Sequence, residues 1–283
     1  MHQGKYVFSQ IMDMVCRYDF NKCVSRYDGE HRVKILSCWE QFLALAFGQL
    51  SFRESLRDIV VCLGAHREKL YHLGFRSPVQ KSTIADANEN RDWRIYRDFA
   101  ETLIKETETV YAHDTPFNDE LTATVYVLDS TTIELCLTLF SWARISNERA
   151  ALKLHLGLDL KGKIPAFFNI SDGKCSDVEY LDALKFEVGA YYVMDRGYID
   201  FTRLHRIHAA HAFFVTRSRK DIRWQRLYSH PVNKQKGIYC DQTIRLTTRD
   251  GRKHYPETFR LTLKNRLGYG IINRTGVLYT YAR

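Results

Sequence analysis

The sequence has 283 residues, enough for one large domain or two modest ones, and its 45% hydrophobic content is enough for a core. No apolar stretch approaches the roughly 18–20 residues that span a membrane, and the N-terminus lacks the apolar core of a signal peptide. Seven widely spaced cysteines without a Cys-x-x-Cys pair indicate reduced side chains rather than a disulfide or zinc framework. We therefore expect a soluble cytoplasmic protein with no membrane partner.

The excess of positive charge lies entirely in the last quarter of the chain. The formal net charge is +9, yet residues 217–283 alone hold 16 Lys and Arg against 4 Asp and Glu. The preceding 216 residues are slightly acidic. A phosphate backbone is the usual partner of such a basic surface, although charge alone also fits a solvated face.

The first 112 residues are predicted to form a helical domain of the DNA-binding type. Residues 37–40 (SCWE) have the pattern of a capping box, in which the Ser hydroxyl caps the first amides and the Glu reaches back. Residues 51–54 (SFRE) repeat the pattern before apolar residues at helical spacing over 56–63. Two more helices are expected over 82–90 and 92–111. A small helical bundle without affinity for DNA also fits this pattern.

Residues 113–121 are polar, contain a proline and are predicted as a linker. The hydrophobic period then changes, and the elements expected up to residue 217 are strands over 122–128, 153–160 and 163–170, a helix over 178–186, a strand over 190–194, a helix over 201–210 and a strand over 212–216. This order predicts an α/β, ribonuclease-H-like core with a mixed sheet over 122–217. The basic residues 218–283 show strand-like pieces over 239–246 and 259–263 and no clear helix, and we interpret them as an incomplete β-rich insertion.

Two carboxylates occupy corresponding positions after apolar runs. Asp129 follows VYVL and Asp195 follows YYVM, so each is expected at the C-terminal end of a strand, the edge at which open α/β sheets bind ligands. If the two strands are neighbours, the carboxylates converge and can share Mg²⁺, which takes oxygen ligands. Such a site suits in-line attack on a phosphodiester. A strand-end Asp can also be only a turn-former or a helix cap.

Several sequence blocks carry a resemblance to a known family. They are VYVLDSTTI around Asp129, ALKLHLGLDL, and YYVMDRGYIDF around Asp195, preceded by SCWEQFLALAFGQLSFRESLRDI. These blocks resemble those of bacterial insertion-sequence transposases, most of all the large DDE group numbered four in the classification of insertion sequences. Residues 4–75 resemble the helical domain that precedes the catalytic core in that group. The resemblance runs over residues 4–256.

The resemblance implies a transposase that cleaves and transfers DNA strands, with Mg²⁺ as cofactor and Mn²⁺ as substitute. Asp129 and Asp195 would be the first two members of its catalytic triad and its metal ligands. Arg196 matches the Arg after the second Asp and would contact a phosphate. Lys153 and His155 match a further box, assigned here to nucleic-acid binding, although His155 also fits a hydrogen-bonded structural role. The implied partners are double-stranded DNA with terminal inverted repeats and a second copy of the chain, at the bacterial nucleoid.

The third carboxylate of the family is the feature that we do not find. The family places it in a Tyr-x-x-Arg-x-x-x-Glu-x-x-x-x-x-x-Lys pattern on a helix. No tyrosine after Asp195 has Arg three positions later and Glu seven positions later, and the last glutamate, Glu257, directly follows a proline. From about residue 260 the family pattern is no longer recognisable. We therefore expect a C-terminally truncated copy, ended by a frameshift or an early stop, with strand-transfer activity near background.

Two other interpretations stay open on the sequence alone. A complete metal-dependent nuclease of the same fold would need another third ligand, such as Asp177 or Asp200. A non-catalytic DNA-binding regulator that inhibits a full-length transposase would need only the helical domain and the basic residues 217–274. The candidate phosphate contacts in this basic segment are Arg219, Lys220 and Arg223.

Overall fold

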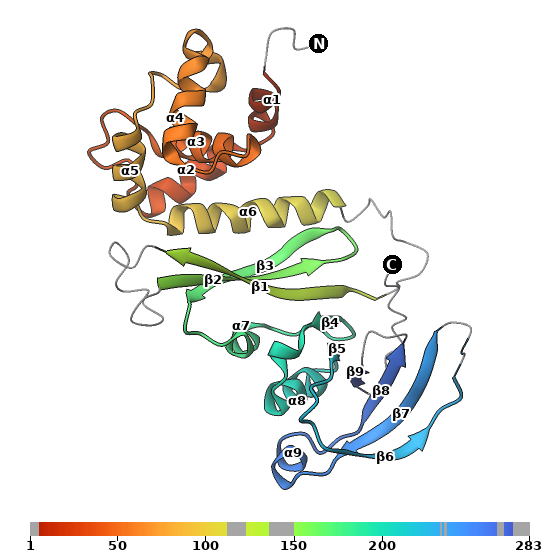
Figure 1. Ribbon diagram of the computed structural model, residues 1–283. Coiled ribbons are helices and arrows are strands. Elements are labelled where there is room, and N and C mark those ends of the chain that lie inside the picture. Colours follow the sequence, from red (N-terminus) through yellow and green to blue (C-terminus); the bar gives the residue numbers. More distant parts are fainter. Residues whose placement is uncertain are drawn as a thin grey trace. The chain divides into compact units, whose positions relative to one another are not determined.

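The computed structural model describes residues 6–111, 123–135, 150–232, 234, 237–264 and 269–273. The chain divides into two compact units, Met1–Leu103 and Ile104–Arg283, so that the boundary falls inside helix α6 (Arg94–Tyr111). Figure 1 shows the helices of the first unit in red to yellow and the strands of the second in green to blue. The predicted linker over 113–121 lies outside the described residues.

The first unit is a set of helices around an apolar core, as the sequence predicts. Besides α6, its α-helices are α1 (Val7–Asp13), α2 (Arg17–Arg26), α3 (Cys38–Leu50), α4 (Leu56–Ala65) and α5 (Lys81–Asn90), with 3-10 turns η1 (Arg67–Lys69) and η2 (Tyr71–Leu73). Phe20 lies at the centre of the core, with its ring 5.2 Å from that of Trp39 and 5.0 Å from that of Phe99. Both contacts are edge-to-face, an arrangement that aromatic quadrupoles favour.

The capping box at the start of α3 forms as predicted. The Ser37 hydroxyl accepts from the amide of Glu40, and the Glu40 carboxylate accepts from the amide of Ser37 at 2.9 Å. The same carboxylate accepts from the Arg76 guanidinium at 2.8 Å, although it is almost fully buried. Burial alone would raise the pKa of Glu40, but the bonds from Arg76 and Ser37 lower it to about 2. Glu40 therefore ties the start of α3 to the segment before α5.

The second predicted capping box is wrong. Ser51 is the C-cap of α3, and its hydroxyl donates to the Phe47 carbonyl at 2.6 Å. Helix α4 begins four residues later than predicted, because Ser55 provides the N-cap and accepts from the amide of Asp58 at 3.1 Å. Both serines are followed three residues later by an acidic side chain, so the local pattern did not distinguish them.

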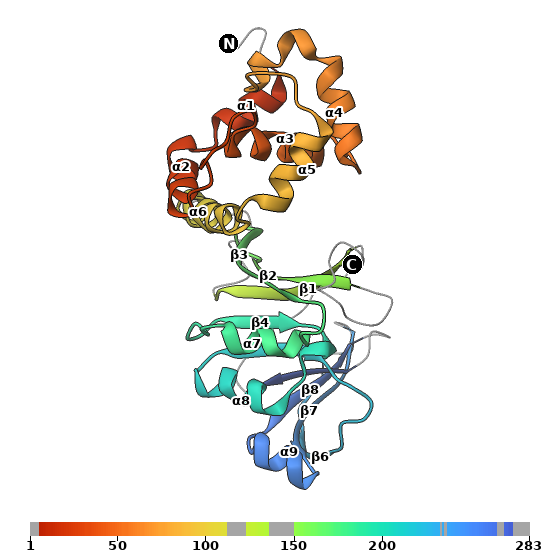
Figure 2. The same ribbon diagram turned by 90° about the vertical axis from the view of Figure 1, so that its left-hand side faces the viewer.

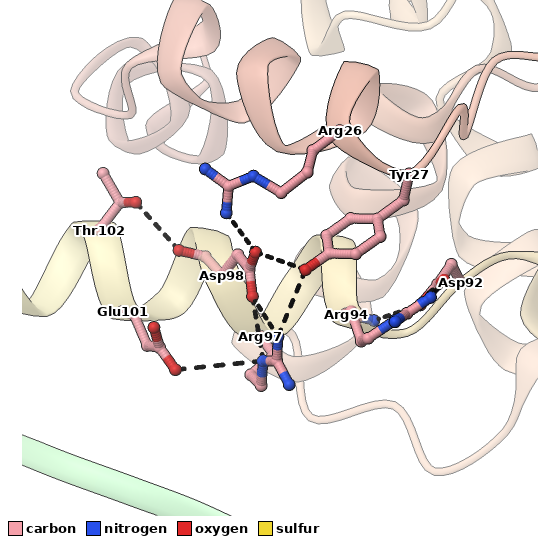
Figure 3. Close-up of polar contacts among 8 residues, drawn as sticks. All are labelled: Arg26, Tyr27, Asp92, Arg94, Arg97, Asp98, Glu101 and Thr102. Carbon is pink, nitrogen blue, oxygen red and sulfur yellow. Dashed lines mark hydrogen bonds and ion pairs between the residues drawn. The ribbon is translucent and has the colours of Figure 1, made fainter.

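Asp98 links α6 to the end of α2 (Figure 3). Its carboxylate accepts from the Tyr27 hydroxyl at 2.7 Å, from the Arg97 guanidinium at 2.7 Å and from Arg26. The side chain is only 8% exposed, so these donors replace the water that the carboxylate loses. The Tyr27 hydroxyl, more than either Arg, lowers the pKa of Asp98 from 3.8 to about 2.

The second unit is built on one sheet. Its described strands are β1 (Val125–Leu135), β2 (Ala150–Asp159), β3 (Ile164–Asp172), β4 (Tyr191–Met194), β5 (Phe213–Arg217), β6 (Trp224–Ser229), β7 (Ile238–Leu246), β8 (Phe259–Lys264) and β9 (Tyr269–Asn273). Among the described residues they follow the order β3-β2-β1-β4-β5-β9-β8-β7-β6. The β1–β2–β3 pairs are antiparallel, whereas β4 is parallel to both β1 and β5. This mixed α/β core confirms the predicted fold class.

The helices of this unit cover one face of the sheet (Figure 2). They are the 3-10 turns η4 (Asp177–Glu179) and η5 (Arg196–Tyr198) and the helices α7 (Tyr180–Ala183), α8 (Phe201–Ala209) and α9 (Arg249–His254). Their apolar side chains pack on every second residue of the strands, because side chains alternate between the faces of a sheet. The fully buried members of this core include Tyr192, Phe214 and Leu261.

The basic segment joins the same sheet. The predicted strands over 239–246 and 259–263 correspond to β7 and β8, but β6, β9 and helix α9 were not predicted. Strand β9 pairs with β5 of the core, with Arg217 opposite Gly270. Because β9 in turn pairs with β8, the four strands β6 to β9 extend the core sheet.

Six cysteines lie in the described part of the chain, and all six have free thiols. The seventh, Cys136, lies outside the described residues. Within the same described part, no helix is long and apolar enough to cross a membrane.

We expect Asp98→Asn to lower the free energy of unfolding by about 1–3 kcal/mol, because it leaves Tyr27 and two guanidinium groups without their carboxylate. Folding lowers the pKa of the Asp98 carboxyl, so its ionised form stabilises the folded state. This stabilisation is fully present above about pH 4 and is lost as the pH falls toward 2. The difference between wild type and variant should therefore shrink over this range. Urea denaturation at several pH values measures it.

Glu101→Gln is the matched control. Glu101 lies on the same helix, but its side chain is 52% exposed and its ion pair with Arg97 is long, at 4.0 Å. We expect a loss below about 0.5 kcal/mol there. Equal losses in the two variants would contradict the assigned role of Asp98.

Candidate active site on the central strands

Asp129 and Asp195 occupy neighbouring positions on adjacent strands. The last paired residues of the parallel strands β1 and β4 are Leu128 and Met194. Each Asp is the next residue of its chain segment, so the two lie side by side across strands that are roughly 4.8 Å apart. The two strands that carry Asp129 and Asp195 are therefore neighbours, which is the condition under which the two carboxylates converge.

The two carboxylates face away from the core. Leu128 and Met194 are 2% and 4% exposed and belong to the core, whereas Asp129 and Asp195 are exposed. Alternation of side chains along a strand explains this difference. Asp195 ends its strand as predicted. Asp129 does not, because β1 continues to Leu135 along β2, and only its pairing with β4 stops before Asp129.

A backbone amide orients each carboxylate in the same way. Oδ1 of Asp129 accepts from the amide of Ser130 at 2.8 Å, and Oδ1 of Asp195 accepts from the amide of Arg196 at 2.7 Å. Each carboxylate keeps a second oxygen for another ligand. Mg²⁺ is usually bound through one or two carboxylates, with water and substrate phosphate completing the shell, so this pair of oxygen donors fits it. Among the described residues, no group of three or more acidic, His or Cys side chains is placed to hold a metal.

Arg217 extends this row and was missed in the sequence. Met194 pairs with Thr216 of β5, so Arg217 is the neighbour of Asp195 on the next strand. It is exposed, whereas Thr216 is buried. The signal was available, because Arg217 follows the apolar run from Phe213 to Thr216 just as each Asp follows its own run. Two carboxylates and a guanidinium thus lie on three adjacent strands of one face.

The predicted basic contacts after the core strands are accessible. Arg196 directly follows Asp195 and is exposed. The segment between β5 and β6 exposes Arg219, Lys220 and Arg223. Arg219 has an ion pair with Asp221 at 3.6 Å, and such exposed pairs hold a side chain weakly.

The predicted nucleic-acid contacts Lys153 and His155 both have partners within the second unit. His155 is fully buried, stacks on Tyr180 with the ring centroids 4.8 Å apart, and has its Nε2 2.8 Å from the Ser171 hydroxyl. Burial lowers its pKa. The ammonium of Lys153 donates to Asp177 at 3.0 Å and to the Cys175 carbonyl at 2.9 Å. These contacts favour the structural role that the sequence left open for His155, and nucleic-acid binding by the two residues stays a prediction.

The two alternative third ligands lie in different surroundings. Asp200 is the N-cap of α8, where it accepts from the amide of Arg203 at 2.9 Å. Asp177 lies behind the sheet, where it accepts from the Ser130 hydroxyl at 2.8 Å and from Lys153. Each carboxylate has partners of its own, and neither shares the exposed face of Asp129.

Comparison with known proteins agrees with this geometry. The strand order and the acidic pair on adjacent central strands are those expected of the ribonuclease-H-like class of α/β folds. Residues 120–268, more than half of the chain, match the family model described as "Transposase DDE domain". The chain therefore belongs to the family of transposases with a DDE domain. Residues 3–76 match a second model, described as "Domain of unknown function (DUF4372)".

A protein of Sinorhizobium fredii named "Putative transposase y4zB" is 29% identical over 192 residues. The match covers 66% of this chain and 52% of that protein, so the chain spans about half the length of this relative. The family match also corrects the sequence interpretation at one point. It continues to residue 268, beyond residue 256, and the added part includes β8.

We expect Asp129→Asn and Asp195→Asn each to weaken Mn²⁺ binding more than about tenfold, since replacing even an outer-shell partner of a metal ligand costs this much. Asp200→Asn is the matched control, because its carboxylate caps α8. Titration with detection of free Mn²⁺ by electron paramagnetic resonance gives the affinities. An Asp200 variant that loses Mn²⁺ while the Asp129 variant keeps it would overturn this assignment.

Proposed function

We propose that the chain provides the DNA-binding part and two of the catalytic carboxylates of a transposase that cleaves and joins phosphodiester bonds at DNA ends. The observation that carries the proposal is the row of Asp129, Asp195 and Arg217 on adjacent strands. Two carboxylates beside a guanidinium suit a phosphate approached together with a divalent ion, because Arg favours phosphate oxygens. Membership of the DDE transposase family supports the same reaction class.

The proposed cofactor is Mg²⁺, held by Asp129 and Asp195, with Mn²⁺ as a substitute. When bound, such an ion lowers the pKa of an attacking hydroxyl and stabilises the leaving oxygen. The protein's contribution is to hold the two carboxylates side by side and to orient each through the next amide. Arg196 and Arg217 are exposed beside them and would neutralise the phosphate that is attacked.

The proposed partner is double-stranded DNA, with the terminal inverted repeats of a transposon as its specific form. Residues 1–112 would be the helical DNA-binding domain, 122–217 the catalytic core and 218–283 a basic β-rich extension. The exposed cations of the β5–β6 connection begin two residues after Arg217, so they would continue the track of a backbone that leaves the site. A homodimer working at the bacterial nucleoid is the assembly that fits two transposon ends.

A non-catalytic role is the second candidate, and one observation favours it. The site brings together two carboxylates, and the family's pattern for the third is not found after Asp195. Two carboxylates carry less charge than the usual three, so these 283 residues alone would hold metal ions weakly. Such a chain would bind DNA without cutting it and would act as a regulator of a complete transposase.

We expect the triple variant Arg219→Ala, Lys220→Ala, Arg223→Ala to weaken binding to a duplex and to reduce the slope of log affinity against log salt by about 2–3, because each lost phosphate contact removes roughly 0.9 from the slope. Lys161→Ala is the control, because Lys161 is an exposed cation in the β2–β3 turn, beyond the start of β1, whereas the two carboxylates follow the β1–β4 pairing at its other end. Fluorescence anisotropy at several salt concentrations measures the slope. An unchanged slope in the triple variant would refute this DNA track.

A polypeptide of these 283 residues is expected to bind duplex DNA but to cleave it at background rate in Mg²⁺ or Mn²⁺. The reference is the double variant Asp129→Asn, Asp195→Asn, which lacks both proposed ligands. Nicking of an end-labelled duplex is the measurement. Cleavage by the wild-type chain clearly above that of the double variant would show that a third ligand is present. The non-catalytic, regulatory function would then be wrong.

A further inference from the structure

A polar cluster lies on the covered face of the sheet, directly behind the two carboxylates. Asp177, at the start of η4, accepts from the Ser130 hydroxyl at 2.8 Å and from the Lys153 ammonium at 3.0 Å. Lys153 is 18% exposed and Asp177 is 29% exposed, so the ion pair is largely removed from water. Neither the metal ligation nor the DNA contacts proposed above involve Asp177.

The cluster reaches Asp129 through Ser130. The amide of Ser130 donates to the Asp129 carboxylate at 2.8 Å, and the hydroxyl of the same residue donates to Asp177. Ser130 points to the covered face while Asp129 points to the open face, since the two are consecutive in β1. The hydrogen bond to Asp177 on the covered face therefore holds Ser130, whose amide orients Asp129.

The same carboxylate also meets the segment that carries Asp195. Turn η4 packs against turn η5, which begins at Arg196. A Cβ atom added to Gly197 would lie 3.6 Å from Oδ2 of Asp177, so this carboxylate lies close to η5 and a side chain at position 197 would meet it. Gly197 follows Arg196, the residue whose amide orients Asp195. Asp177 thus bonds to one of the segments that orient the proposed ligands through Oδ1 and lies close to the other with Oδ2.

Lys153 keeps Asp177 charged and occupied. Burial alone would raise the pKa of Asp177, but the hydrogen bonds from Lys153 and Ser130 outweigh it and lower the pKa. An oxygen that already accepts from an ammonium and a hydroxyl is a poor ligand for a further cation. Tyr198 completes the cluster with a buried hydroxyl, whose pKa burial raises to about 12 although the Ser130 side chain offsets part of this shift.

We propose that Asp177 is a positioning residue that sets the spacing of Asp129 and Asp195 by clamping Ser130 and η5 from the covered face, without binding the metal itself. The inference rests on the proposed function, because it concerns the same pair of metal ligands. It assigns a role to Asp177 that differs from that of a third ligand. A ligand contacts the ion directly, whereas the clamp acts only through its neighbours.

The test is the affinity of the 283-residue chain for Mn²⁺ alone, measured by electron paramagnetic resonance, together with thermal unfolding of each variant. We expect Asp177→Asn and Ser130→Ala each to weaken Mn²⁺ binding about tenfold, the lower end of the range for outer-shell partners. The double variant should bind Mn²⁺ as tightly as the single variant with the lower affinity, because both substitutions break the same chain of contacts. Asp182→Asn is the matched control, since Asp182 lies on α7 and its carboxylate pairs with Arg203 at 2.5 Å.

Each of the following results would overturn the inference. If Asp177→Asn abolishes binding while Ser130→Ala leaves it unchanged, Asp177 is a ligand. If both variants bind Mn²⁺ like wild type and differ only in their unfolding temperature, the cluster serves stability alone. If the wild-type chain shows no Mn²⁺ binding that depends on Asp129 and Asp195, both the proposed function and the role of Asp177 are wrong. If the wild-type chain binds Mn²⁺ and Asp177→Asn does not change the affinity, only the proposed role of Asp177 is wrong.

Discussion

The parallel pairing of β1 with β4 is the constraint on which the rest of the site depends. It ends at Leu128 and Met194, both buried, and thereby places Asp129 and Asp195 next to each other on the open face. A slip of one residue would exchange the faces, burying the carboxylates and exposing the core residues. The burial of Leu128 and Met194 therefore stabilises the one register in which the two carboxylates converge.

Near Asp129 and Asp195, the two faces of the sheet have different roles. The open face carries the row of charges from Asp129 to Arg217, which are available to a ligand. The covered face holds their supports, in which the buried His155 stacks on Tyr180 and the Lys153–Asp177 pair binds Ser130. Buried polar groups of this kind are costly unless they are paired, which gives the support a fixed geometry. Strand β2 supplies Lys153 and His155, so it contributes to the site from the covered face.

The sequence predicted the parts that depend on local patterns. Apolar runs before Asp129 and Asp195 located the strands, and the capping box at Ser37 located α3. The parts that depend on distant pairing were not predictable in this way. Ser130 and Asp177 are 47 positions apart, and only the sheet register brings them together. Arg217 carried a readable signal, but its meaning required the β4–β5 alignment.

We predict a single divalent-ion site between β1 and β4. The most direct measurement is an anomalous difference map, recorded near the manganese edge, from crystals of the chain soaked in Mn²⁺. We predict a peak within coordinating distance of a carboxylate oxygen of Asp129 and one of Asp195, with Asp177 still bound to Lys153. A peak on Asp177 or Asp200 that leaves Asp129 without an ion, or no peak at either central Asp at saturating Mn²⁺, would contradict the account.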